Sequence, residues 1–151
     1  MTKAAELAKM GEVLTNNQLG GRRNIVYNGA MQISQRSTSE TGLGASGDYY
    51  TLDRYKSIPS NLSGRFTQSQ ATITDLPGFA NALKMECTTA DTSIAAGEYF
   101  ILQQSFEGQD LQQMKKGTSS AEEVTVSFYV KGNANATYVL ELYDSDNNRH
   151  T

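Results

Sequence analysis

The sequence holds few of the residues that carry catalytic or metal chemistry. Cys87 is the only cysteine and His150 the only histidine among 151 residues. A single cysteine cannot form an intramolecular disulfide or a cysteine-based zinc site, and a single histidine near the end cannot serve a two-histidine metal site or an interior Ser-His-Asp triad. We therefore predict that the chain is not an enzyme and has no catalytic residues, no metal site and no cofactor.

Two acidic clusters are open to a functional interpretation. Asp144, Asp146 and Asn148 have the spacing that begins a calcium loop. Arg149 stands where such a loop needs glycine, and no glutamate follows, so we predict a hairpin turn instead. Glu122 and Glu123 are adjacent, and neighbouring residues of a strand point to opposite faces, so they cannot flank one glycosidic bond.

Arg36, Asp53 and Arg54 are the strongest candidates for a binding or structural site. A buried or half-buried arginine–carboxylate pair would hold the two segments together. The same residue types, with tyrosine, also bind the hydroxyls and ring faces of sugars. We favour the structural ion pair and keep the glycan contact as the alternative. Tyr49 and Tyr50 could form a stacking platform, but packing in the core or at its rim is the more common role.

Composition and charge exclude several classes of protein. Hydrophobic residues make up 38% and charged residues 19%, and the formal net charge is −3. The basic pairs Arg22-Arg23 and Lys115-Lys116 are too small to neutralise a nucleic-acid backbone. No apolar run approaches the roughly twenty residues of a membrane span, and the first ten residues lack a secretory signal pattern. We expect no nucleic-acid partner, no membrane insertion and a protein made in a cytoplasm.

The first twenty residues predict a short helix followed by a hinge. Thr2 to Leu14 has a helical pattern with Thr2 as N-cap, and Gly20-Gly21 permits unusual backbone angles. The helix is too short to be stable alone, so it should dock on its own domain, on its copies in an oligomer or on another protein. We therefore assign 1–20 as an anchor and hinge. Its predicted contact residues are Leu7, Met10, Val13 and Leu14.

Residues 21–151 predict an antiparallel β-sandwich of jelly-roll type, because short alternating segments are separated by turn signals. The predicted strands cover 49–58, 64–73, 82–88, 99–106, 124–130 and 138–142, with a loop over 37–47 and a helical turn over 109–115. The predicted core contains Leu83, Met85, Val124, Val126, Phe128, Val130, Tyr138, Leu140 and Leu142. The last turn comes where another strand should begin, so we expect the chain to be the front part of a longer protein.

Two motifs carry a resemblance to a known group of proteins. Asn24 to Arg36 reads Asn-x-x-x-Asn-Gly-x-Met-x-x-x-Gln-Arg, and Tyr50 to Tyr55 reads Tyr-x-x-Asp-Arg-aromatic. This pairing resembles the opening part of bacteriophage tail-fibre-like virion structural proteins, of the marine phage type. The resemblance extends over nearly all of the chain. Further matching stretches are 1–23, Leu76 to Phe79, Ala82 to Lys84, Gln103-Gln104, Glu107-Gly108 and Val126 to Lys131.

The resemblance implies a mainly β virion protein, assembled in the host cytoplasm, that is anchored by its N-terminus and involved in host attachment. It implies other virion proteins and further copies of the chain, as a homotrimer, as partners, with a host surface glycan as a further candidate. Two alternatives stay open: a head-fibre or decoration protein of the capsid, and a carbohydrate-binding module of a larger protein. The sequence does not decide between tail and capsid, and it does not identify the receptor.

Overall fold

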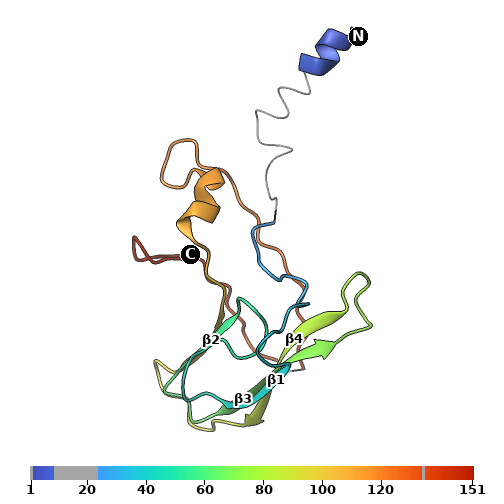
Figure 1. Cartoon of the computed structure of the whole chain (residues 1–151). Helices are drawn as coiled ribbons and strands as arrows, with labels where there is room; N and C mark the ends of the chain where they lie inside the picture. Colours follow the sequence, from blue (N-terminus) through green and yellow to red (C-terminus); the bar gives the residue numbers. More distant parts are fainter. Residues whose placement is uncertain (1, 9–23, 134) are drawn as a thin grey trace.

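The structure is a computed structural model that describes residues 2–8, 24–133 and 135–151. Residues 3–8 are helical, and the main-chain N–H of Glu6 donates to the carbonyl of Thr2 at 3.2 Å. The rest of the predicted helix, with Met10, Val13 and Leu14, lies outside the described residues, as does the Gly20-Gly21 hinge. The helical segment is drawn in dark blue in Figure 1.

The described chain is mainly β, with antiparallel sheets and little helix. This agrees with the predicted fold class. The largest sheet has the order β1-β3-β4, from β1 (Ser39–Leu43), β3 (Arg65–Thr72) and β4 (Asn81–Thr89). A second sheet pairs β2 (Lys56–Ser60) with β5 (Tyr99–Gln103), and a hairpin pairs β6 (Tyr143–Asp144) with β7 (Arg149–His150). A 3-10 helix, η1 (Gly108–Met114), follows β5 (Figure 1).

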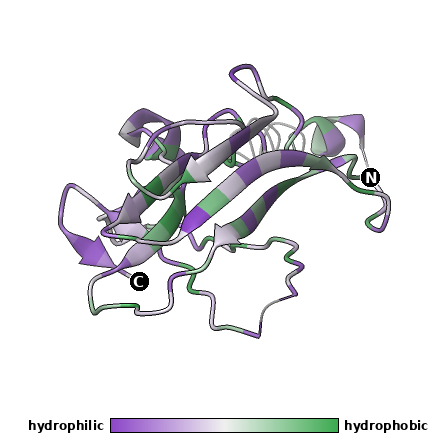
Figure 2. Cartoon of the chain, turned by 90° about the horizontal axis from the view of Figure 1, so that it is seen from below, coloured by the Kyte–Doolittle hydropathy of each residue, from purple (hydrophilic) through white to green (hydrophobic). Residues whose placement is uncertain are grey.

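The long hairpin of β3 and β4 follows directly from the sequence. Both predicted strands are confirmed within one or two residues, and Gln68 faces Met85 in the antiparallel register. Along β4, the half-buried Leu83 and Met85 alternate with the exposed Lys84 and Glu86, which gives that strand one side for packing and one for water. Figure 2 colours each residue by its hydropathy and shows green and purple bands along the strands. Residues 73–80 connect the two strands, and the predicted helical turn over 109–115 is confirmed as η1.

The centre of the fold is small and partly polar. Leu43 and Leu52 are its buried apolar residues among those described, and Thr51, Ser57 and Gln68 are the buried polar ones. The Ser57 hydroxyl on β2 donates to the Gln68 side-chain carbonyl on β3 at 2.6 Å. These bonds and packing contacts join the two larger sheets, and the Phe66 and Phe100 rings add a contact with centroids 4.8 Å apart.

The predicted core strands 124–130 and 138–142 are wrong for this chain. Neither is a strand, and their apolar side chains are exposed. Leu83 and Met85 on β4 are only half-buried. The exposed fractions are 50% for Val124, 45% for Val126, 64% for Phe128, 72% for Val130, 67% for Tyr138, 54% for Leu140 and 47% for Leu142. Apart from Leu142, which bonds to Thr151 through both of its main-chain groups, these two segments have no main-chain partner among the described residues, and a strand requires one.

Two local predictions are also corrected. β1 lies within the predicted loop 37–47, where it pairs with β3 through an irregular register between Glu40 and Leu43. The predicted strand 49–58 is wrong over 49–55, and β2 continues through Pro59 because an edge strand needs no further donor there. In the first motif, Asn28 has a positive φ of 52°.

Candidate functional site

The two motifs of the sequence meet at a surface hollow. Its volume is about 490 Å³. Gln35 and Arg36 come from the end of the first motif, and Asp53 and Arg54 from the loop before β2. Tyr49, from the same loop, completes the lining. The structure therefore brings together Arg36, Asp53 and Arg54, the three candidate site residues chosen from the sequence.

Asp53 holds the two motif segments in place through its main chain and one side-chain oxygen. Its N–H donates to the carbonyl of Ile33 at 3.1 Å, and its Oδ1 accepts the main-chain N–H of Gln35 at 3.0 Å. Its carbonyl accepts the Asn28 side-chain amide at 3.2 Å. The predicted linking of the segments is present, but hydrogen bonds to the backbone carry it, not an ion pair.

Asn28 is a positioning residue that its place in the first motif did not by itself reveal. Its side-chain amide donates to the carbonyl of Ile33 at 2.9 Å, and its Oδ1 accepts the Ile33 N–H at 3.0 Å. The side chain thus pairs with Ile33 as a neighbouring strand would. The signal in the sequence is the tolerance of asparagine for positive φ, which lets its short amide turn back onto the chain.

The arginines of the hollow rest on tyrosine rings. The Arg36 guanidinium lies 5.5 Å from the Tyr49 ring centroid, and the Arg54 guanidinium lies 4.7 Å from that of Tyr27. Neither arginine forms an ion pair with a carboxylate in the part of the chain that the structure describes. Cation–π attraction orients a guanidinium without neutralising its charge. The hollow therefore presents positive charge in a chain whose net charge is −3.

The Tyr27 ring beneath Arg54 is itself held in position. The Tyr27 hydroxyl donates to Asp110 on η1 at 2.5 Å, and the Tyr27 ring stacks with Phe106 at 6.2 Å. The nearby Tyr55 is half-buried, and this burial raises the pKa of its hydroxyl, while a hydrogen bond with Gln104 acts in the opposite direction. The support of the hollow thus extends from the first motif to residues near η1.

The residue types in the hollow suit binding of a ligand that carries both negative charge and hydroxyl groups. Two guanidinium groups donate hydrogen bonds to an anion, while the Asp53 carboxylate and the Gln35 amide offer acceptors. Over the described ranges, no group of three or more histidine, cysteine, aspartate and glutamate residues is arranged for a metal ion.

The other selected residues lie away from the lining of the hollow. Asp144 begins a hairpin turn, as predicted, and binds Lys116 at 2.7 Å and the Asn147 amide at 2.8 Å. The hydrogen bond with Lys116, with help from Asn147, lowers the pKa of Asp144 to about 2. Leu7 is 72% exposed, and the remaining anchor residues lie outside the described part.

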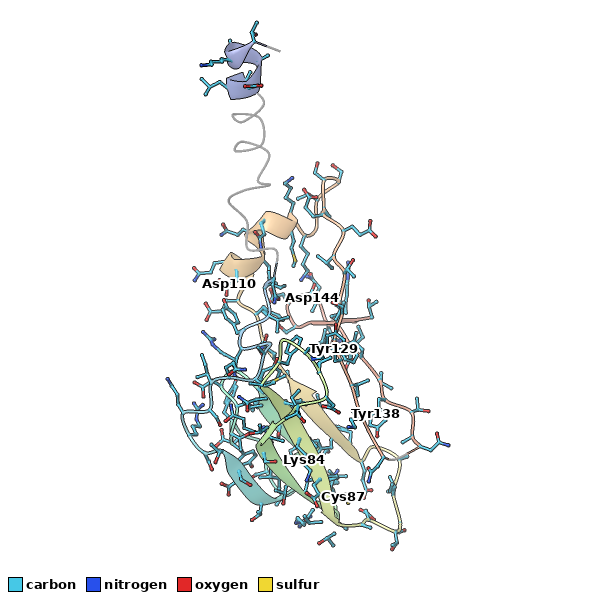
Figure 3. All side chains as sticks on the ribbon, turned by 90° about the vertical axis from the view of Figure 1, so that its right-hand side faces the viewer. Lys84, Cys87, Asp110, Tyr129, Tyr138 and Asp144 are labelled. Carbon is cyan, nitrogen blue, oxygen red and sulfur yellow. The ribbon has the colours of Figure 1, made fainter. Side chains whose placement is uncertain are left out.

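Residues 124–142 form a second notable surface, which we call the apolar segment. Figure 3 shows Tyr129 and Tyr138 on this extended segment beside the strands. Tyr129 contacts the Phe79 ring with centroids 5.6 Å apart, and Lys131 binds Asp75 at 2.5 Å. With residue 134 set aside, residues 124–141 make no main-chain hydrogen bonds to one another or to other described residues. The segment thus combines exposed apolar side chains with unpaired backbone groups.

Comparisons with known proteins add no relative. No family model matches the chain, and neither a curated protein nor a solved structure is significantly similar to it. Within the described residues, no helix has the length and apolar character needed to cross a bilayer.

Proposed function

We propose that this chain is a structural subunit of a bacteriophage particle, the front part of a tail-fibre or appendage protein that contributes to host attachment. The motifs that flank the hollow support the virion assignment through their resemblance to such proteins. The two motifs together line the hollow, and they supply no set of catalytic residues. The subunit is a binding and architectural protein in this proposal, and the head-fibre and carbohydrate-binding-module alternatives stay open.

The apolar segment is the observation that carries the proposal. Val124, Val126, Phe128 and Val130 alternate along an extended chain, and each is at least 45% exposed. An exposed apolar surface together with unpaired N–H and C=O groups favours association through an added strand. A subunit built in this way is suited to an assembly, where another surface covers the segment.

We further propose that copies of the chain supply this cover in a homotrimer, and that the sheets then complete a sandwich of jelly-roll type. Burial of a phenylalanine or valine side chain contributes about 1.5–3 kcal/mol before the losses of association. Several such side chains in each subunit give a favourable interface. Closed symmetric contacts also remove the unpaired strand edge that an isolated copy presents.

Sedimentation of the purified full chain tests this proposal. The wild type is expected to form a trimer, and Phe128→Asp is expected to shift it toward the monomer because a carboxylate cannot be buried unpaired in the interface. Ile94→Asp is the matched control, since Ile94 is 73% exposed and lies outside the apolar segment. A wild type that stays monomeric at all concentrations, or equal effects of the two variants, would contradict self-association through this segment.

A further inference from the structure

We propose that the hollow lined by Gln35, Arg36, Tyr49, Asp53 and Arg54 binds a uronic acid residue of an acidic polysaccharide. This deepens the proposed function, on which it rests for the identification of the polysaccharide as a host surface glycan. The hollow has a volume of about 490 Å³. Small-molecule sites commonly have volumes of roughly 300–1,000 Å³, so one sugar residue with part of its neighbours fits.

The two arginines supply recognition of the sugar carboxylate. A guanidinium donates two parallel hydrogen bonds to a carboxylate, and its charge strengthens both. Arg36 and Arg54 keep this capacity, because their contacts are with the Tyr49 and Tyr27 rings and not with carboxylates in the described part of the chain. Lys56 lies 5.9 Å from the Tyr49 ring centroid and adds positive charge nearby.

Asp53 favours an acidic sugar over a simple inorganic anion. A carboxylate in the lining repels phosphate or sulfate, so a site for such ions would gain nothing from it. Its Oδ1 already accepts the Gln35 N–H, whereas no described residue donates to its Oδ2. An acceptor beside two cationic donors matches a ligand that has hydroxyl groups next to its carboxylate. The Gln35 side-chain amide can both donate and accept in the same place.

The backbone of Arg54 adds an independent indication. Its φ is 73°, in the left-handed region that residues with long side chains rarely adopt. Such a conformation is strained and persists only where the surroundings impose it, and strained residues of this kind cluster at binding sites. Here Arg54 lies in a turn closed by the Tyr55 N–H, which donates to the Leu52 carbonyl at 3.3 Å, and its guanidinium lines the hollow.

Calorimetric titration of the full chain with trigalacturonic acid tests the inference. The wild type is expected to bind it and not the neutral trigalactose. Arg36→Gln and Arg54→Gln should each weaken binding by roughly tenfold or more, the usual effect of losing a charge-assisted hydrogen-bonding partner. Lys84→Gln is the matched control, because it removes the same charge from a side chain that does not line the hollow. Figure 3 places Lys84 on β4.

Two further variants keep the test decisive if a glutamine variant unfolds. Arg36→Lys keeps the charge but loses the two-donor fork, so its binding should fall several-fold while its melting temperature stays close to that of the wild type. Asp53→Asn keeps the Oδ1 acceptor for Gln35 and removes the repulsion, so it should bind inorganic sulfate better and trigalacturonic acid worse than the wild type.

Three results would overturn the inference: no binding of trigalacturonic acid, equal binding of the neutral trisaccharide, or equal losses from Lys84→Gln and the arginine variants. Incorporation into particles separates this failure from failure of the proposed function. Wild-type subunits that enter virions normally but bind no uronate would refute only the proposed ligand. A chain that binds uronate but enters no virion would refute only the virion assignment.

Discussion

The side-chain amide of Gln104 pairs with the main chain of Tyr27, 77 residues earlier. Its Oε1 accepts the Tyr27 N–H at 3.0 Å, and its Nε2 donates to the Tyr27 carbonyl at 2.7 Å. Both groups of one peptide segment are thus satisfied by one side chain. The pair connects the first motif, which builds the hollow, to the chain after β5.

Gln104→Ala is therefore expected to lower the free energy of unfolding by about 1–3 kcal/mol, because two part-buried main-chain groups lose their partner. Gln104→Glu should cost at least as much at neutral pH, since a carboxylate cannot donate to the Tyr27 carbonyl. Urea denaturation measures both. Gln103→Ala is the control, because the Gln103 amide donates only to the exposed Ser105 hydroxyl, and its loss should stay within about 0.5 kcal/mol.

The buried Ser57–Gln68 pair predicts non-additive effects of substitution. Gln68→Leu leaves the Ser57 hydroxyl buried without its acceptor, which should cost about 1–3 kcal/mol. Adding Ser57→Ala removes that orphaned group. The double variant should then regain most of the loss, since the Gln68 Nε2 also has no partner among described residues. Additive losses in thermal unfolding of the two single variants and the double variant would show that the pair is not coupled.

The Asp144 carboxyl should titrate far below an ordinary aspartate. Its pKa is lowered from 3.8 to about 2, first by the hydrogen bond from Lys116. A folded-state pKa below the unfolded value stabilises the fold above pH 4, and that contribution is lost as the pH falls toward 2. In carboxyl NMR titrations Lys116→Gln should move the Asp144 midpoint upward. Lys115→Gln should not, because Lys115 pairs with Glu122; an unmoved midpoint in Lys116→Gln would refute the assigned cause.

Deletion of residues 1–15 tests the predicted anchor with its Leu7, Met10, Val13 and Leu14 contacts. We expect the shortened chain to keep its sheets, because the described residues 2–8 are exposed and contribute nothing to the core. Its incorporation into phage particles should be lost. Circular dichroism checks the fold, and immunoblots of purified virions measure incorporation. Normal incorporation would place the anchor elsewhere in the chain.

The absence of catalysis remains a prediction from the single histidine and cysteine. The purified chain should release no reducing sugar from acidic host polysaccharide, even where it binds. Reducing-end assays over several hours measure this. Turnover that disappears in Glu122→Gln, Glu123→Gln or Asp53→Asn, while these variants still fold, would show that the chain is an enzyme.

Local patterns in the sequence were enough to predict the elements whose partners lie close along the chain. The β3–β4 hairpin, the η1 turn and the β6–β7 turn follow from alternation and turn residues, which act over a few positions. The choice of Arg36, Asp53 and Arg54 also came from the sequence. Short-range preferences suffice in these cases because each element's geometry depends mainly on its immediate neighbours.

Only the tertiary structure decided which groups these elements meet. The apolar pattern of 124–142 predicts strands, but a strand exists only where another backbone accepts its hydrogen bonds. Among the described residues of this segment, only Leu142 has such a partner, Thr151. Likewise, charge alone suggested that the arginines pair with carboxylates, whereas Arg36 and Arg54 lie against Tyr49 and Tyr27. Partners distant in sequence are chosen by packing in three dimensions, which no local spacing records.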